Sequence, residues 1–287
     1  MEIVPAQAVS SVPQVRDDML IRMWLHGRTP NTVTAYAADA NSFLQFAGRP
    51  LAEIGLADLQ RWAENLSEQA PASRARRLAV VKSLLSFALK LGYLQIDPGR
   101  MLRIEKPAIT SGDHLLSPAD VLRMIGMEPD LRARTMLRLV YACGLRASEA
   151  CGLRWRDMTG TDKKGGQANI LGKGSKLRTA LIPADLWRDL AALTPAVRPD
   201  SPVVPGRHGG AMDRQALHRL VKRAVRRAGV NPKASSHWLR HSATSHAIAG
   251  GCDIQTVRER LGHASLATTT RYAHAAPDKG LANYLKY

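Results

Sequence analysis

The stretch 168-ANILGKGSKLRTALIP-183 differs from the rest of this chain, because β-compatible residues flank a short basic turn. Ile170 and Leu171 form one apolar arm, and residues 180–182 form the other, around Gly-Lys-Gly-Ser-Lys. Two such arms joined by a glycine-containing turn are typical of a β-hairpin. The other periodic segments of the chain are helical, so we expect a mainly α fold with a small β component.

Helical periodicity continues on both sides of the hairpin. Apolar residues recur there at intervals of three and four, which is the spacing of amphipathic helices. We expect helices over residues 117–128, 131–143, 147–152, 184–194, 212–228, 236–249 and 253–262, and around 265–273. Together with the hairpin, these helices predict a mixed α+β domain in the second half of the chain.

The first hundred residues are expected to be helical throughout. The segment 29-TPNTVTAYAADANSFLQFAG-48 has amphipathic spacing after a Thr-Pro start. Further helices are expected over 15–27, 57–68 and from about residue 72 to Gly92. Four helices joined by short loops suggest a small bundle.

A linker separates the two halves. The stretch 104-IEKPAITSGDHLLSP-118 contains two prolines and a Ser-Gly pair and has no helical periodicity. We therefore divide the chain into a helical domain over residues 1–106, a linker over 107–114 and a second domain over 115–287.

Positive charge is concentrated in the second half. Lys and Arg number 41 against 24 Asp and Glu, an excess of +17. Residues 1–108 hold 13 cations and 10 acids, a net of +3, whereas residues 109–287 hold 28 and 14, a net of +14. This balance predicts a polyanionic partner, either nucleic acid or an acidic membrane surface.

Composition narrows the class of protein further. With 45% hydrophobic and 23% charged residues, a largely disordered chain is excluded. Three cysteines, an odd number in a long chain, argue against a disulfide framework and favour a reducing, intracellular setting. No window approaches the roughly 18 apolar residues of a membrane span, and no signal peptide is visible. We therefore expect an intracellular protein without a membrane-spanning segment.

Two helices carry clustered cations. In helix 212–228 the cations follow one face, opposite an apolar stripe, and no acid follows Asp213. These cations are Arg219, Lys222, Arg223, Arg226 and Arg227. Because like charges on one face repel unless an anion lies against them, we interpret this face as a nucleic-acid-backbone contact, with a solvated face as the alternative. Arg74, Arg76 and Arg77 at the start of the helix near residue 72 allow the same two interpretations.

Three short clusters in the basic half contain residue types typical of catalytic or metal-binding sites: 143-CGLRASEACGLRW-155, 237-HWLRH-241 and 261-LGHASLATTTRY-272. His237 and His241 have the spacing of metal ligands, and His263 would complete a three-histidine site. Arg240 would place a fixed cation beside any such metal, so we expect none. The Gly-Lys-Gly turn of the hairpin matches neither a dinucleotide-binding nor a Walker motif, and therefore predicts no nucleotide site.

Taken in order, the clusters form one pattern. Arg-x-x-Glu, a hairpin lysine, His-x-x-Arg-His, Leu-Gly-His and a tyrosine nine residues after that histidine resemble the tyrosine recombinase (phage integrase) family. The resemblance covers almost the whole chain and is greatest to compact Xer-type recombinases and small integrases. It implies a helical, SAM-like core-binding domain followed by a tyrosine-recombinase catalytic domain. Trp238 and Ala243 depart from the residues that are frequent at their positions.

The resemblance implies a role for each residue of the pattern. Tyr272 would attack a DNA phosphodiester and form a 3′-phosphotyrosyl link, while Arg146 and Arg240 would clamp the phosphate. Lys173 would protonate the leaving 5′-oxygen, and Lys176 on the same hairpin is its rival for that role. His237 and His263 would contact the same phosphate, and Glu149 and His241 would give structural support. Neither ATP nor a metal is implied as a cofactor.

The resemblance also implies the partners. The DNA partner is double-stranded and contains inverted-repeat core sites. The chain would act on two such sites as a homotetramer. A second recombinase or an accessory factor is an optional further partner. The protein would then be cytoplasmic and associated with the nucleoid, with no membrane as a partner. Integration, excision and resolution share one catalytic set, so the pattern does not separate them. Two alternatives stay open: a DNA-binding protein of this fold that does not recombine, and a topoisomerase IB-like nicking-closing enzyme.

Overall fold

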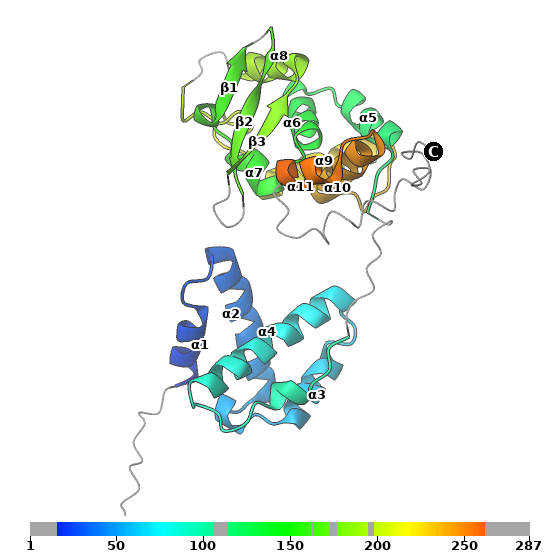
Figure 1. The fold of residues 1–287 in the computed structure, drawn as a ribbon. Coiled ribbons are helices and arrows are strands. Elements are labelled where there is room, and N and C mark those ends of the chain that lie inside the picture. Colours follow the sequence, from blue (N-terminus) through cyan, green and yellow to red (C-terminus); the bar gives the residue numbers. More distant parts are fainter. Residues whose placement is uncertain (1–15, 106–113, 162, 173–176, 195–197, 262–287) are drawn as a thin grey trace, which may run out of the picture. The chain divides into compact units, whose positions relative to one another are not determined.

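The chain folds into two compact units, Met1–Ile109 and Thr110–Tyr287. The computed structural model describes residues 16–105, 114–161, 163–172, 177–194 and 198–261 (Figure 1). The division between the units falls within the predicted linker, most of which lies outside the described residues.

The first unit is built from the four expected helices. They are α1 (Asp17–Leu25), α2 (Pro30–Ala47), α3 (Leu56–Asn65) and α4 (Pro71–Lys90), with 3-10 turns at Leu51–Glu53 and Pro98–Met101. Both α2 and α4 begin with a proline. A backbone N–H at this first position makes no hydrogen bond within the helix, so proline, which lacks the N–H, loses no bond there. The long helices α2 and α4 pack together over a core that includes Phe43, Leu84 and Leu85.

The second unit contains seven described helices. They are α5 (Pro118–Gly126), α6 (Leu131–Ala142), α7 (Ala147–Gly152), α8 (Ala184–Leu193), α9 (Arg214–Ala228), α10 (Ser236–Ala249) and α11 (Ile254–Leu261). Side chains of Ser117, Asp130 and Asp213 accept hydrogen bonds from backbone N–H groups at the starts of α5, α6 and α9. The helix expected around 265–273 lies outside the described residues.

A small antiparallel sheet completes the second unit. Its order is β1 (Met158–Thr161), β2 (Gly165–Leu171) and β3 (Leu177–Ile182). Leu171 pairs with Leu177 and Gly166 with Ile182, which confirms the predicted hairpin. Sequence analysis missed β1, because Met-Thr-Gly-Thr is short and three of its four residues are exposed, so it shows no apolar alternation.

Helix α8 packs on the sheet next to β2 (Figure 1). A Cβ atom at Gly166 would lie 2.2 Å from the Trp187 ring, so glycine is needed there for close approach. Trp187 in turn meets Trp155 edge to face, with ring centroids 5.7 Å apart. The sheet is therefore fixed to the helical core on this face.

Membrane-spanning helices are not found among the described residues, since none of those helices is both long and apolar enough.

Candidate active site and DNA-contacting cations

Arg240 is held in the second unit by backbone carbonyls from two other segments. Its Nη1 donates to the Gly144 carbonyl at 2.5 Å, and its Nη2 donates to the Leu261 carbonyl at the end of α11 at 2.7 Å. Gly144 has φ of +56°, and a Cβ there would lie 2.4 Å from Leu261 Cδ2. Glycine is therefore required at this turn, both for its conformation and for the approach of α11.

One carboxylate, that of Glu149 in α7, joins three arginines. Its Oε1 accepts from Arg146 Nη1 at 2.8 Å, and its Oε2 accepts from the Arg146 backbone N–H at 2.8 Å. Arg178 Nη2 donates to Oε2 at 2.7 Å, and Arg240 Nη1 lies 3.6 Å from the same oxygen. The structure thus brings together three residues of the sequence pattern, Arg146, Glu149 and Arg240, around a shared carboxylate.

Sequence analysis did not identify Arg178, although a signal for it exists. Residues alternate faces along β3, and Arg178 shares the buried face with Ala180 and Ile182. An arginine on the core face of a strand needs an anionic partner, because burying an unpaired charge is costly. Glu149 is that partner, and both side chains are only 5% exposed.

The cluster has a net positive charge. Three guanidinium groups face one carboxylate, a balance of +2. Burial alone would raise the pKa of Glu149, but the Arg146 backbone N–H and the nearby arginine charges outweigh it and hold the pKa below its ordinary value. Burial and the neighbouring Arg146 lower the pKa of Arg240 to about 10, so it stays cationic at neutral pH.

The cluster also has an accessible edge. Arg146 is 35% exposed, whereas Glu149 and Arg240 are 5% exposed. Arg146 uses Nη1 for Glu149 and keeps further N–H donors for an anion from outside. Guanidinium pairs suit the geometry of phosphate oxygens, so the arrangement can stabilise a phosphate on which negative charge builds up.

His237 and His241 lie on one face of α10, beside the arginine cluster. Their Nε2 atoms are 2.7 Å apart, so one ring donates a hydrogen bond to the other. Burial, followed by the charges of Arg240, His114 and Arg146, lowers the pKa of His237 below its ordinary value. His237 is therefore a neutral group at physiological pH, able to accept a proton.

The last linker residue, His114, and Leu116, just beyond the linker, both contact the same helix. The Leu116 backbone N–H donates to Ser242 Oγ at 2.9 Å, and the His114 ring packs against Trp238 with centroids 5.1 Å apart. Trp238 is buried, so its departure from the family pattern concerns packing beneath α10.

Three predicted catalytic residues, Lys173, His263 and Tyr272, lie outside the described residues, as does Lys176, the rival of Lys173. Of the thiols, Cys143 is buried, and this burial raises its pKa to about 12, which rules out a reactive thiolate at neutral pH. Within the described residues, no group of three or more His, Cys, Asp or Glu side chains is arranged to hold a metal.

The cationic face of α9 is divided between internal contacts and solvent. Lys222 Nζ donates to the Pro232 carbonyl at 2.7 Å, and Arg227 pairs with Glu128, which precedes α6. Arg219, Arg223 and Arg226 are exposed and have no ion pair within the described part of the chain. Sequence analysis treated the five as one surface, because the carboxylate and carbonyl that engage two of them come from distant segments.

The arginines of α4 are divided in a similar way. Arg76 donates two hydrogen bonds to Asp39 of α2, and Arg77 lies 3.5 Å from the same carboxylate. Asp39 is buried, so these two arginines neutralise it and join α2 to α4. Arg74 has no such partner among the described residues, and it remains a candidate for contact with an external anion.

Comparison with known proteins gives consistent results for both units. Residues 115–279 match the phage integrase family, and residues 23–92 match the phage integrase N-terminal SAM-like domain. Tyrosine recombinase XerC of Xylella fastidiosa (strain M23) is 31% identical over 263 residues, which cover 86% of this chain and 87% of XerC.

Two solved structures share the fold. XerH site-specific recombinase bound to its difH substrate in a pre-cleavage complex has a TM-score of 0.70 and 20% identity, covering 89% of this chain and 80% of XerH. A lambda integrase tetramer bound to a Holliday junction has a TM-score of 0.72 and 15% identity, covering 89% of this chain and 75% of the integrase.

Proposed function

The chain belongs to the phage integrase family and is a tyrosine-type site-specific recombinase, and we propose that it cleaves and rejoins DNA through a 3′-phosphotyrosyl intermediate formed by Tyr272. The observation that carries this proposal is the cluster of Arg146, Arg178 and Arg240 around Glu149, which leaves a net positive, partly accessible site. No other described cluster combines two residues of the family's phosphate clamp with a shared buried carboxylate.

In the proposed reaction, the Tyr272 hydroxyl attacks the scissile phosphorus and the bond to the 5′-oxygen breaks. The non-bridging oxygens gain negative charge in the transition state, and Arg146 and Arg240 donate hydrogen bonds to them. Losing one such donor costs roughly 10²–10³ in rate. Because Glu149 and two backbone carbonyls already orient these side chains, little reorganisation is needed when the charge develops.

Proton transfers accompany both bond changes. His237, whose lowered pKa keeps it neutral, assists removal of the tyrosine proton and hydrogen bonds to the phosphate. Lys173, or Lys176 on the same hairpin, protonates the leaving 5′-oxygen, and His263 contacts the same phosphate. His263 follows Leu261, whose carbonyl binds Arg240, by two residues, which supports its assignment to this site.

The phosphotyrosyl link conserves the energy of the broken phosphodiester. Attack of a 5′-hydroxyl on that link reverses the reaction and seals the strand, so neither ATP nor a metal is needed for rejoining. Exchange follows when the attacking hydroxyl belongs to a different duplex.

We propose that four copies act on two DNA sites that each contain inverted repeats. The related lambda integrase forms a tetramer on a Holliday junction, and XerH is a site-specific recombinase on its own difH substrate. The concentration of charge in residues 109–287, a net of +14, supports extensive phosphate contacts by the catalytic domain. The protein would act in the cytoplasm, on the nucleoid.

The proposal is tested with DNA sites captured from the genome of the source organism. Purified protein is mixed with sheared genomic DNA and denatured in SDS, and the covalently attached fragments are sequenced. Plasmids with one or two copies of the recovered site are then incubated with the protein. Recombinant products that require two copies are expected. Adducts scattered without a common site, with relaxation of any supercoiled plasmid and no recombinants, would instead indicate a topoisomerase-like enzyme.

A further inference from the structure

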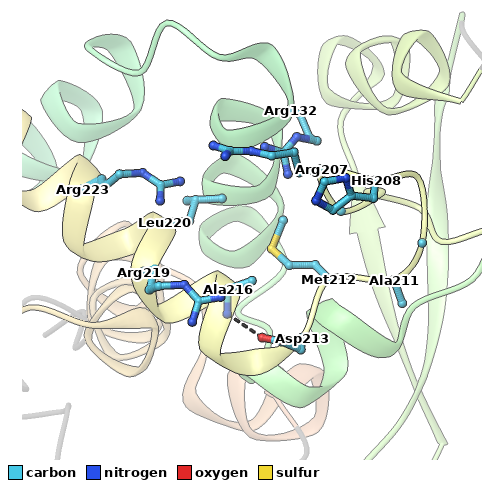
Figure 2. Close-up of a pocket in the computed structure, with 12 residues that line it drawn as sticks. Arg132, Arg207, His208, Ala211, Met212, Asp213, Ala216, Arg219, Leu220 and Arg223 are labelled. Atoms are coloured by element: carbon cyan, nitrogen blue, oxygen red, sulfur yellow. Dashed lines mark hydrogen bonds between the residues drawn. The ribbon is translucent and has the colours of Figure 1, made fainter.

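A cationic cavity of about 400 Å³ lies in the second unit (Figure 2). It is bounded by the first turn of α6, the turn at residues 206–210 and one face of α9. Its lining includes four arginines and a histidine: Arg132, Arg207, Arg219, Arg223 and His208. None of the residues of the proposed phosphate clamp lines it.

The fold brings these cations together from three segments. The turn at 206–210 is closed by hydrogen bonds from the Gly206 N–H to the Gly210 carbonyl at 2.6 Å and from the Gly209 N–H to the Gly206 carbonyl at 3.1 Å. Gly209 has φ of +82°, a conformation that favours glycine, and the turn carries Arg207 and His208 at its tip. Arg219 and Arg223 are four residues apart on α9 and therefore share a face.

Charge in the cavity is not balanced by the protein. Arg132 is 19% exposed and pairs with Asp130 at 3.1 Å. Asp213 is the one carboxylate among the described lining residues, and it accepts a hydrogen bond from the Ala216 N–H at the start of α9. Arg207, Arg219 and Arg223 form no ion pair with any residue that the structure describes. Four guanidinium groups thus face two carboxylates, before any charge on His208 is counted.

We propose that this cavity binds a nucleotide phosphate, as a second anion site distinct from the scissile-phosphate site. Guanidinium groups that approach from several directions match the oxygens of a tetrahedral phosphate, which accept two or more hydrogen bonds each. The volume exceeds that of a lone phosphate and lies in the range of small-ligand pockets, so an attached sugar also fits.

The phosphate has two sources with the same chemistry, the backbone of bound DNA and a free phosphorylated compound. Arg219 and Arg223 lie on the helix face that we propose to contact DNA, so the backbone source rests on the proposed function. The cavity itself does not rest on that function, since its charge and shape are properties of the unbound protein.

Two variants on α9 provide a matched test. Arg223→Gln and Arg226→Gln each remove one exposed, unpaired charge from the same helix, three residues apart, but only Arg223 lines the cavity. Arg207→Gln removes a lining charge from a different segment. All three replace exposed side chains, and urea unfolding of each variant checks that its fold is retained.

Binding of inorganic phosphate to the full-length protein is measured by calorimetry at constant ionic strength, with chloride as the reference anion. We expect Arg223→Gln and Arg207→Gln to weaken phosphate binding by roughly tenfold or more, the loss of a hydrogen bond to a charged group. Arg226→Gln should retain the affinity of the unsubstituted protein. Equal effects of Arg223→Gln and Arg226→Gln, or no phosphate binding beyond chloride, would overturn the proposal.

Duplex DNA binding separates the two sources. If backbone phosphate occupies the cavity, inorganic phosphate will compete with a duplex for the unsubstituted protein and for Arg226→Gln, but much less for Arg223→Gln. If a free compound occupies it, phosphate will bind without displacing the duplex, and the site itself is still supported. Formation of the SDS-resistant DNA adduct is measured in parallel, because it reports on the proposed function independently of this cavity.

Discussion

At the scale of single residues, Glu149 is the group on which the proposed phosphate clamp depends. It is 5% exposed, and it is the shared partner of Arg146, Arg178 and Arg240. Replacing it would remove the carboxylate that the three guanidinium groups share, two of them buried. Since an unpaired buried charge is far more costly than an exposed one, stability and catalysis should both respond.

We expect Glu149→Gln to lower the free energy of unfolding of the second unit by about 3–5 kcal/mol at pH 7, the usual cost of breaking a buried ion pair. The pKa of Glu149 is depressed below 4.5, so its contribution is present above that pH and is lost as the pH falls through the lower, folded-state value. Glu149→Gln should therefore flatten the acid dependence of stability, as measured by urea unfolding at several pH values.

Asp200→Asn is the control for that experiment. Asp200 also pairs with an arginine, Arg156, but both side chains are largely exposed. Such pairs contribute at most about 1 kcal/mol, so stability should hardly change. A similar decrease in the free energy of unfolding in both variants would contradict the conclusion that the ion pairs of Glu149 stabilise the second unit more than an exposed ion pair does.

The lowered pKa of His237 leads to a prediction for the pH dependence of DNA cleavage. Its pKa lies below 6.5, because it is partly buried and faces Arg240 on α10, Arg146 before α7 and His114 at the end of the linker; His241 is its hydrogen-bond partner. The neutral ring therefore still predominates at pH 6.5, and the proton is gained only at lower pH. We expect the single-turnover rate of adduct formation to fall at acid pH with a midpoint below 6.5, and this acid limb to be absent in His237→Asn. A midpoint at or above 6.5 would contradict this assignment.

At the scale of elements, the helices of the first unit and the hairpin were predictable, whereas contacts between elements were not. Periodicity identified α2, α4 and both arms of the hairpin, because each has a local apolar pattern. β1 was missed, since it pairs through its backbone and shows no such pattern. Arg178 was also missed, although strand alternation places it on the buried face, because its partner Glu149 lies 29 residues away and only the folded structure brings the two together.

The arginines of α4 show how such contacts alter a functional interpretation. Sequence analysis grouped Arg74, Arg76 and Arg77 as one cationic edge, but Asp39 of α2 engages the last two. We expect Arg76→Gln to lower the free energy of unfolding of the first unit by roughly 1–3 kcal/mol, because hydrogen bonds to a buried carboxylate are lost.

Arg74→Gln should behave in the opposite way, with unchanged stability and weaker binding to duplex DNA. The slope of log K against log salt concentration should fall by about one if Arg74 contacts a phosphate. Urea unfolding and fluorescence anisotropy on both variants check the two expectations. Unchanged DNA binding in Arg74→Gln would show that this edge is merely solvated.

At the scale of the whole molecule, most of the net positive charge and all of the predicted catalytic residues belong to the second unit. The net charge of residues 109–287 is +14, against +3 for residues 1–108, and the cluster around Glu149 belongs to the more basic part. The sequence was sufficient to predict this concentration of charge and the order of the motifs. It did not show that Lys222 and Arg227 are engaged internally, nor that Arg132 and Arg207 join Arg219 and Arg223 around one cavity.

The central claim is that Tyr272 becomes covalently attached to DNA, and the most direct measurement is the yield of a protein–DNA adduct that survives SDS. A nicked duplex containing the captured site, from which the cleaved end diffuses away, prevents rejoining and accumulates the intermediate. We predict an adduct with the unsubstituted protein and with Tyr284→Phe, a control in the same C-terminal stretch, but none with Tyr272→Phe. An adduct that persists in Tyr272→Phe, or its absence from the unsubstituted protein bound to that DNA, would contradict the account.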